Sequence, residues 1–405
     1  MHTARPLILL FTAATAVAIA SRRIKIPYTV ALVLAGLALG ATHAIEDIHL
    51  TKELLYAVFL PGLLFEAAYH LPAAEVRNQA RSILGLAVPG VVASAAATAA
   101  LLVWSSSAAD AARGFGWSHA LVFAALIAST DPIAVVSLFK SLGAPRRLAL
   151  LVEGESLVND GTGVVLFTIV FSAASGEATS IGSGVAQFLG FVGLGLLVGA
   201  AVGLAVSRVI QGVDEPRIEI TLTTIAAYGA FVVAEDLHVS GLIATVTAGM
   251  VCGNIAAPRG MSPTTRIAVE SFWSYVAFAL NSLVFLLIGL EVRLSALLGN
   301  WRPILLAFVA VTLGRAAVVF LASALLRRTR EAIPWRWSLV LTWAGMRGAL
   351  SMVLVLAIPV DFPQRQLLVT MTFGVVLLSI LIQGITAGPL LRALGLVGKD
   401  GAASH

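Results

Sequence analysis

The sequence predicts an all-α polytopic membrane protein, and three observations carry that prediction. The chain has 405 residues, of which 59% are hydrophobic and only 12% are charged, a composition far more apolar than that of a soluble domain. Most of it consists of apolar runs of about 17 to 25 residues, the length that crosses about 30 Å of hydrocarbon as a helix. The period-2 alternation of outer-membrane barrels is not visible. The spans are therefore expected to be helices.

Hydropathy divides the chain into thirteen predicted spans. They cover residues 6–20, 27–44, 54–69, 83–104, 117–139, 148–175, 182–206, 218–234, 239–258, 271–290, 303–325, 338–359 and 367–391. Only short loops join them, so we expect a single membrane domain over residues 1–405. Thirteen spans divide as six, one and six, and the two sets of six then enter the membrane from opposite faces, as inverted-topology repeats do.

The basic residues orient the predicted spans. Eighteen Lys and Arg residues lie after odd-numbered spans or at the C-terminus, and six lie on the other side. Because cytoplasmic loops carry the excess of Lys and Arg, we expect the N-terminus outside and the C-terminus in the cytoplasm. The same rule accounts for the net charge of +5 without a nucleic-acid partner. The short loops favour a bacterial inner membrane.

Few residues suggest a cofactor or a disulfide. The single cysteine, Cys252, excludes a disulfide framework and any CxxC site. The histidines fall near span ends or in loops, and they do not form a metal-binding pattern. We therefore expect no cofactor.

Ionisable residues inside the spans are the main functional signal. Each costs roughly 2.5 to 3.5 kcal/mol at the bilayer centre and marks a functional site by default. Seven are present: Glu66, Asp131, Glu153, Glu155, Asp160, Arg315 and Arg347. Glu153 is nearest the cytoplasmic end, so we expect it to be solvated or paired locally.

Asp131 lies beside a predicted helix break. Within Ser129–Thr130–Asp131–Pro132, Pro132 cannot donate a backbone hydrogen bond, so carbonyls near residue 128 should be left unpaired. Hydroxyl, carbonyl and carboxylate oxygens together are what a hard cation prefers. The alternative is a proline kink in which Asp131 only caps the next helical segment.

A second carboxylate, Asp160, is expected near the first. The short loop at about residues 140–147 makes spans 5 and 6 antiparallel, so both acids lie near the midplane. Ser156 and Asp160 share one helix face, with Asn159 beside them. Two carboxylates in a low-dielectric site repel each other, and binding of a positive charge relieves that repulsion. A proton and a cation therefore compete for the same oxygens. The alternative is a structural acid pair neutralised by arginine.

Glu155 requires a basic partner if it is buried. Arginine keeps its proton and grips a carboxylate through two parallel hydrogen bonds. Arg315 and Arg347 both qualify, and the sequence does not choose between them.

Five segments, in this order along the chain, resemble the monovalent cation/proton antiporters, and within them the NhaP and sodium/proton exchanger branch. They are FLPGLLFEAAY at 59–69, TDP at 130–132, GESLVND at 154–160, GMRGA at 345–349, and QGIT at 383–386 before Pro389. The resemblance implies an NhaA/NhaP-like fold in which spans 5 and 12 cross as broken helices. It also implies a homodimer that lies among membrane lipids and exchanges a monovalent cation for a proton.

The resemblance further implies a role for each candidate residue. Asp160 would alternately bind Na⁺ and a proton, Asp131, Thr130 and Ser156 would complete the sodium shell, and Asn159 and Glu66 would support it. Glu155 would pair with Arg315, which leaves Arg347 as a second compensating cation. Asn159 before Asp160 is typical of the electroneutral branch. Because no long tail follows residue 391, the regulatory partners of tailed exchangers are not expected.

Three other functions are open to the same residues. A potassium/proton antiporter could use this oxygen shell with a larger cavity. A passive cation channel is disfavoured because no TVGYG-like filter is present. An intramembrane aspartyl protease would also use two embedded acids, but its YD and GxGD motifs are missing.

Overall fold

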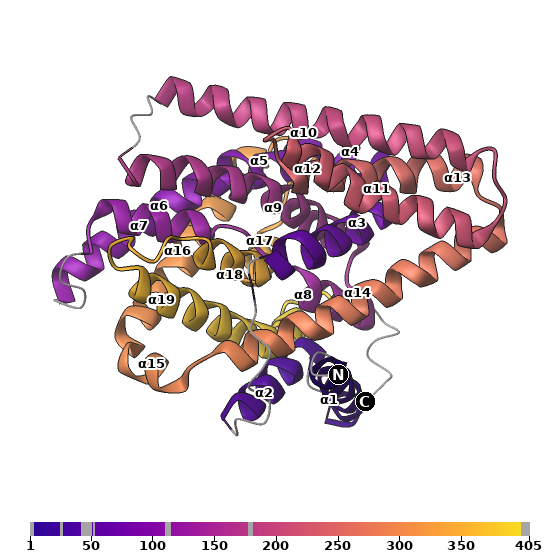
Figure 1. Ribbon diagram of the computed structural model, residues 1–405. Coiled ribbons are helices and arrows are strands. Elements are labelled where there is room, and N and C mark those ends of the chain that lie inside the picture. Colours follow the sequence, from indigo (N-terminus) through magenta and orange to yellow (C-terminus); the bar gives the residue numbers. More distant parts are fainter. Residues whose placement is uncertain are drawn as a thin grey trace. The chain divides into compact units, whose positions relative to one another are not determined.

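The computed structural model describes residues 4–24, 27–41, 51, 53–109, 115–176 and 181–397 (Figure 1). These residues form helices and contain no strand, which confirms the predicted all-helical class. The end of the predicted span 27–44 and the basic residues Lys25, Lys52, Arg113 and Lys399 lie outside the described residues.

Helices lie in all thirteen predicted segments. Eight described helices are long and apolar enough to cross a membrane: Ala80–Ser105, Arg146–Ala174, Gly182–Ile210, Pro216–Asp236, Gly241–Gly260, Pro263–Glu291, Trp301–Leu326 and Arg365–Ala393. Shorter apolar helices occupy Ile8–Ser21, Tyr28–Gly40, Leu54–His70 and Trp117–Leu126. The chain is thus a multi-pass membrane protein.

The chain forms two compact units. Unit 1 comprises Met1–Lys52, Ala80–Asn159 and Ser282–His405, and unit 2 comprises Glu53–Gln79 and Asp160–Asn281. Two of the four boundaries, after Asn159 and after Asn281, fall inside long helices, α9 (Arg146–Ala174) and α14 (Pro263–Glu291). The expectation of a single membrane domain over residues 1–405 remains a prediction.

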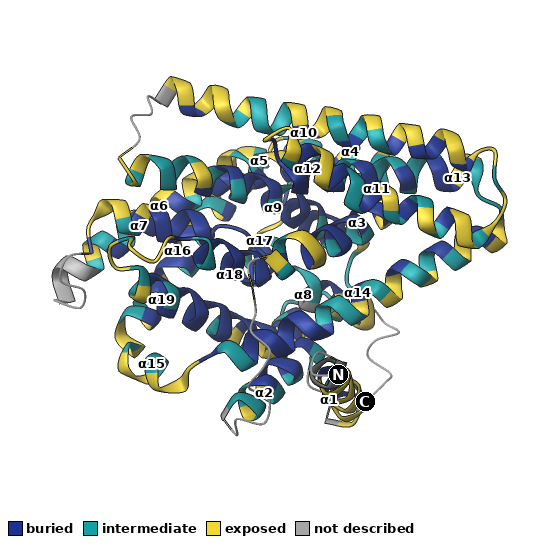
Figure 2. Ribbon diagram, in the orientation of Figure 1, coloured by how far each residue is buried: buried dark blue, intermediate teal, exposed yellow. Residues whose placement is uncertain are grey.

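Unit 1 contains the larger share of the helices. Besides parts of α9 and α14, its elements are α1 (Ala4–Ile24), α2 (Tyr28–Ala41), α5 (Ala80–Ala87), α6 (Pro89–Ala109), α7 (Trp117–Leu126), α8 (Ile133–Leu142), α15 (Leu294–Gly299), α16 (Trp301–Leu326), α17 (Trp335–Trp343), α18 (Ala349–Leu356), α19 (Arg365–Leu378), η3 (Ser379–Gln383) and α20 (Gly384–Ala393). α16 packs against α6, α17 and α19, and α18 packs against α7 and α19. Residues 349–355 of α18 are all buried (Figure 2).

Two helix breaks meet inside unit 1. The first separates α7 from α8, where Pro132 precedes Ile133, and the second separates α17 from α18 at residues 344–348. The backbone N–H of Asp131 in the first break donates to the carbonyl of Met346 in the second, at 2.7 Å. The crossed broken helices implied by the family resemblance are therefore present.

Unit 2 packs around α12. Its elements are η1 (Leu54–Phe59), α3 (Leu60–His70), α4 (Ala73–Asn78), α10 (Ile181–Ile210), α11 (Pro216–Asp236), α12 (Gly241–Val251), η2 (Cys252–Ala256) and α13 (Ala257–Gly260), with parts of α9 and α14. α12 contacts α3, α10 and α11. α10 approaches it closely because Gly199 has no side chain: a Cβ there would overlap the carbonyl of Ala244. The outer face of α10 exposes leucines such as Leu189 and Leu197, as a lipid-facing helix does (Figure 2).

Candidate functional site

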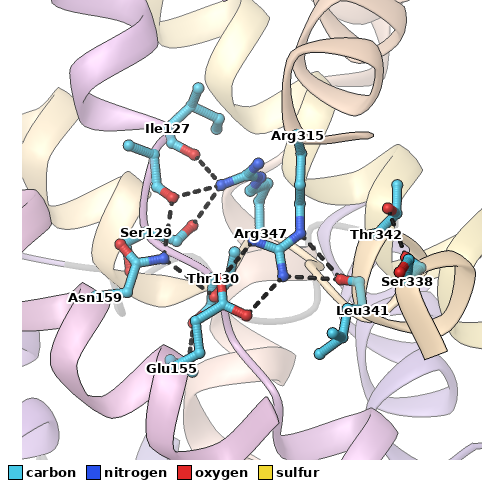
Figure 3. A network of polar contacts seen from close by, with 12 residues as sticks. Ile127, Ser129, Thr130, Glu155, Asn159, Arg315, Ser338, Leu341, Thr342 and Arg347 are labelled. Atoms are coloured by element: carbon cyan, nitrogen blue, oxygen red, sulfur yellow. Dashed lines mark hydrogen bonds and ion pairs between the residues drawn. The ribbon is translucent and has the colours of Figure 1, made fainter. Parts of the chain in front are cut away.

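Arg347 satisfies the carbonyls that the first helix break releases. α7 ends at Leu126, so the carbonyls after it have no helical partner. Arg347 Nη1 donates to the carbonyl oxygens of Ile127 and Ala128 at 2.6 Å and of Ser129 at 3.0 Å (Figure 3). The sequence-based expectation of unpaired carbonyls near residue 128 is therefore wrong. It failed because the guanidinium that binds them comes from the other broken helix.

α9 brings two predicted residues to the same break. Ser156 Oγ donates to the carbonyl of Thr130. Asn159 Nδ2 donates to the carbonyl of Ala128 and to Thr130 Oγ1, both at 3.3 Å (Figure 3). Ser156 and Asn159 are both buried. Thr130, Ser156 and Asn159 thus form one polar cluster, built from the non-helical segment and one face of α9.

Asp131 caps α8, which is the alternative left open by its sequence. Its Oδ1 accepts from the backbone N–H of Ile133 at 3.0 Å. The rest of its side chain lies against Gly348, where a Cβ would overlap Cβ, Cγ and Oδ2 of Asp131. The cap uses Oδ1, so a ligand role for Asp131 depends on Oδ2.

Glu155 is paired with Arg315. Arg315 Nη1 lies 2.8 Å from Glu155 Oε1, and Nη2 lies 3.1 Å from Oε2, in the bidentate geometry (Figure 3). Arg315 Nε and Nη2 also donate to the carbonyl of Leu341, at 3.1 and 2.8 Å. Both residues are buried. The geometry decides between the two arginines: Arg315 holds the carboxylate and Arg347 holds the backbone.

The remaining acids lie elsewhere. Glu153 Oε1 is 3.5 Å from Lys140 Nζ. This is the local pairing that its position near the cytoplasmic end led us to expect. Glu66 belongs to α3 in unit 2, where its Oε1 is 3.3 Å from His70 Nδ1 one turn later. Asp160 follows Asn159 directly in α9, is partly exposed and is the first α9 residue of unit 2.

Two uncharged residues of η3 were missed in the sequence. Ser379 Oγ accepts from the backbone N–H of Arg347 at 3.1 Å. Gln383 is 3% exposed and lines a cavity with Arg347. Neither was expected at the site, because uncharged residues were assigned roles only beside Asp131 and Asp160, and Gln383 stood only as part of the QGIT segment. A buried glutamine in an apolar span was the available signal.

Comparison with known proteins places the chain in a family. A family profile described as "Sodium/hydrogen exchanger, transmembrane" matches residues 8–393. The Na(+)/H(+) antiporter NhaH of Halobacillus dabanensis is 37% identical over 404 residues, which cover 96% of this chain and 97% of that protein. The Na(+)/H(+) antiporter ApNhaP of Aphanothece halophytica is 37% identical over 376 residues, covering 92% of this chain and 71% of that protein.

A solved structure has the same fold. The sodium proton antiporter MjNhaP1 of Methanocaldococcus jannaschii superposes with a TM-score of 0.78 at 19% identity, covering 98% of this chain and all of that one. This agreement extends the motif resemblance to the arrangement of the helices. The chain belongs to the sodium/hydrogen exchanger family.

Proposed function

We propose that the protein is a secondary active antiporter that exchanges Na⁺ or Li⁺ for H⁺ by alternating access. Two relatives that are 37% identical to this chain are named Na(+)/H(+) antiporters, and their names support this assignment. We further propose a homodimer in the plasma membrane of a bacterium, with the N-terminus outside and the C-terminus in the cytoplasm. Transport requires the two ions and no cofactor.

The observation that carries the proposal is the hydrogen bonding of α9 to the α7–α8 break. Ser156 and Asn159 anchor α9 to Thr130, and Asp160 is the next residue of that helix. In the proposed site, Asp160 binds Na⁺ together with Asp131 Oδ2, Thr130 and Ser156. Such an all-oxygen shell suits a hard monovalent cation. Asn159 and Glu66 support the shell without carrying the exchanged proton.

The charges of unit 1 fit this mechanism. Glu155 and Arg315 neutralise each other through their bidentate contact. Arg347 remains as a fixed positive charge on the carbonyls of the break, and arginine does not lose its proton. Na⁺ and a proton then compete for the carboxylate oxygens that Asp131 and Asp160 contribute to the site. Binding of one ion displaces the other, which couples their transport.

Sodium-driven pH change in proteoliposomes tests the proposal. Purified protein is reconstituted with an internal pH dye, and Na⁺, Li⁺ and K⁺ are added in turn. We expect Na⁺ and Li⁺ to change the internal pH. A response to K⁺ alone would identify a potassium/proton antiporter. A current that far exceeds the proton flux would identify a channel, and no response from folded protein would overturn the proposal.

Transport is expected to be electroneutral. Asn159 stands beside Asp160 where a second acid would carry a second proton, so one cation should exchange for one proton. We expect the same initial rate of pH change at imposed potentials of either sign, clamped with valinomycin and K⁺. A rate that rises or falls with the potential would contradict the one-to-one exchange.

Gly348→Ala should impair transport strongly. The added Cβ would overlap the side chain of Asp131, and overpacking of this kind costs about 1–3 kcal/mol. We expect the sodium response to fall about tenfold or more, because Asp131 must move from the break. Gly85→Ala in α5 is the matched control, since a Cβ there meets no atom within 4 Å. Equal activity of the two variants would exclude a role for the position of Asp131.

A further inference from the structure

A small cavity lies beside the two helix breaks in unit 1. Its volume is about 10 Å³, and its lining includes Arg315, Arg347, Thr312, Thr342, Ser379 and Gln383. These residues come from α16, α17, the α17–α18 break and η3. A site that holds one water molecule needs roughly 10–15 Å³ and two to four polar partners. The cavity therefore has room for one water and for no larger ligand.

Two residues that line this cavity each carry a buried side-chain atom with unused hydrogen-bonding capacity. Neither Arg347 Nε nor Gln383 Oε1 has a hydrogen-bond partner among the described residues. Both residues are 3% exposed. Leaving such groups unpaired costs about 1–3 kcal/mol each, and more for a charged group. One is a donor and the other is an acceptor, so a single molecule that both accepts and donates would satisfy the two.

We propose that this cavity binds one ordered water molecule, which accepts a hydrogen bond from Arg347 Nε and donates one to Gln383 Oε1. Its second proton is directed to Thr342 Oγ1 or Thr312 Oγ1. Each of these hydroxyls already donates its own proton to a helix carbonyl, of Ser338 or of Phe308, at 2.8 Å, and therefore keeps an acceptor lone pair. The water then has three partners.

The donors and acceptors at this point favour a water over an ion. A cation would face the Nε–H of Arg347, which has no acceptor atom. An anion would face the Oε1 atom of Gln383. Three carbonyls already occupy Arg347 Nη1, and Glu155 and Leu341 occupy the nitrogens of Arg315, so these groups do not attract an anion.

The bound water makes Gln383 a positioning residue for Arg347. The guanidinium is held on one side by the carbonyls of residues 127–129. The water holds it on the other side, through Nε. Loss of that contact lets the guanidinium rotate, which changes how the carbonyls and Thr130 are held. The effect on transport rests on the proposed function, whereas the water itself does not.

Density for the water is the direct test. A structure of the full-length protein, at a resolution that shows ordered water, should contain a peak within about 2.7–3.2 Å of both Arg347 Nε and Gln383 Oε1. Bromide soaking should add no peak there. A direct bond between Gln383 and Arg347 with the cavity closed would overturn the proposal. A bromide peak would overturn it in favour of an anion held by a reversed amide.

Two substitutions test the positioning role. Gln383→Leu removes the acceptor and should raise the apparent KM for Na⁺ about fivefold at little cost in maximal rate, as expected for one lost hydrogen bond. Gln383→Glu keeps Oε1 and should restore the KM to within about twofold. Thr372→Val is the control, because Thr372 is buried in α19, bonds only its own helix and does not line the cavity.

These variants separate the two proposals. Gln383→Leu with the KM of the unaltered protein, or Gln383→Glu as defective as Gln383→Leu, would overturn the positioning role. If Gln383→Leu does not fold, the comparison of Gln383→Glu with the unaltered protein and the density still decide. Failure of sodium transport in every form, with the water present in density, would overturn the proposed function alone.

Discussion

Asp160→Asn is expected to reduce the sodium-driven pH change to the level of protein-free liposomes. Asparagine keeps the size of the side chain but carries neither the negative charge that attracts a cation nor a carboxyl group that can take up and release a proton. Both halves of the exchange should therefore fail together, for Na⁺ and for Li⁺. The measurement is the initial rate of dye response at saturating Na⁺.

The control for this variant is Asp361→Asn. Asp361 lies exposed between α18 and α19, so the substitution also removes one carboxylate but should leave the rate unchanged. Both proteins should elute as one symmetric peak and melt at the temperature of the unaltered protein. Residual sodium-driven exchange by Asp160→Asn, at a rate near that of the control, would show that another group carries the proton.

Removing one partner of the Glu155–Arg315 pair should destabilise the protein strongly. Arg315→Met leaves Glu155 buried without its bidentate partner, and a broken buried pair costs about 3–5 kcal/mol. The carbonyl of Leu341 loses two donors as well. We expect a large fall in melting temperature in detergent, and Glu155→Leu alone should also lower it, because it leaves the arginine unpaired.

The double variant Glu155→Leu/Arg315→Met distinguishes a charge effect from a packing effect. With both charges gone, the desolvation penalty disappears, so the double variant should be more stable than Arg315→Met alone. Recovery should be incomplete because Leu341 remains without its donors. Additive losses in the two single variants and the double variant would contradict the coupling between these side chains.

The positions of the helices could be predicted because hydropathy is a local property. A run of apolar residues reports a span without reference to the rest of the chain. The first break was predictable for a similar reason, since Pro132 lacks the backbone donor that a continuous helix needs. The second break, at 344–348, contains no proline and was expected only from the family resemblance.

The contacts at the breaks could not be predicted from local sequence. The hydrogen bond from Arg347 to Ile127 joins residues 220 positions apart, and hydropathy carries no information at that separation. For the same reason the sequence left Arg315 and Arg347 as equal partners for Glu155.

Burial was also unpredictable at a helix end. Glu219 stands in the first turn of α11, yet it is fully buried, and its carboxylate has no hydrogen-bond partner within the described part of the chain.

The central claim is that Na⁺ and a proton compete for Asp160, and calorimetry tests it most directly. Na⁺ is titrated into the purified protein at one pH in two buffers with different ionisation enthalpies. If Na⁺ displaces a proton, the buffer takes it up, and the heat per bound Na⁺ must differ between the buffers. Asp160→Asn should show no such difference. Sodium binding with the same heat in both buffers would contradict the claim, because the cation would then bind without releasing a proton.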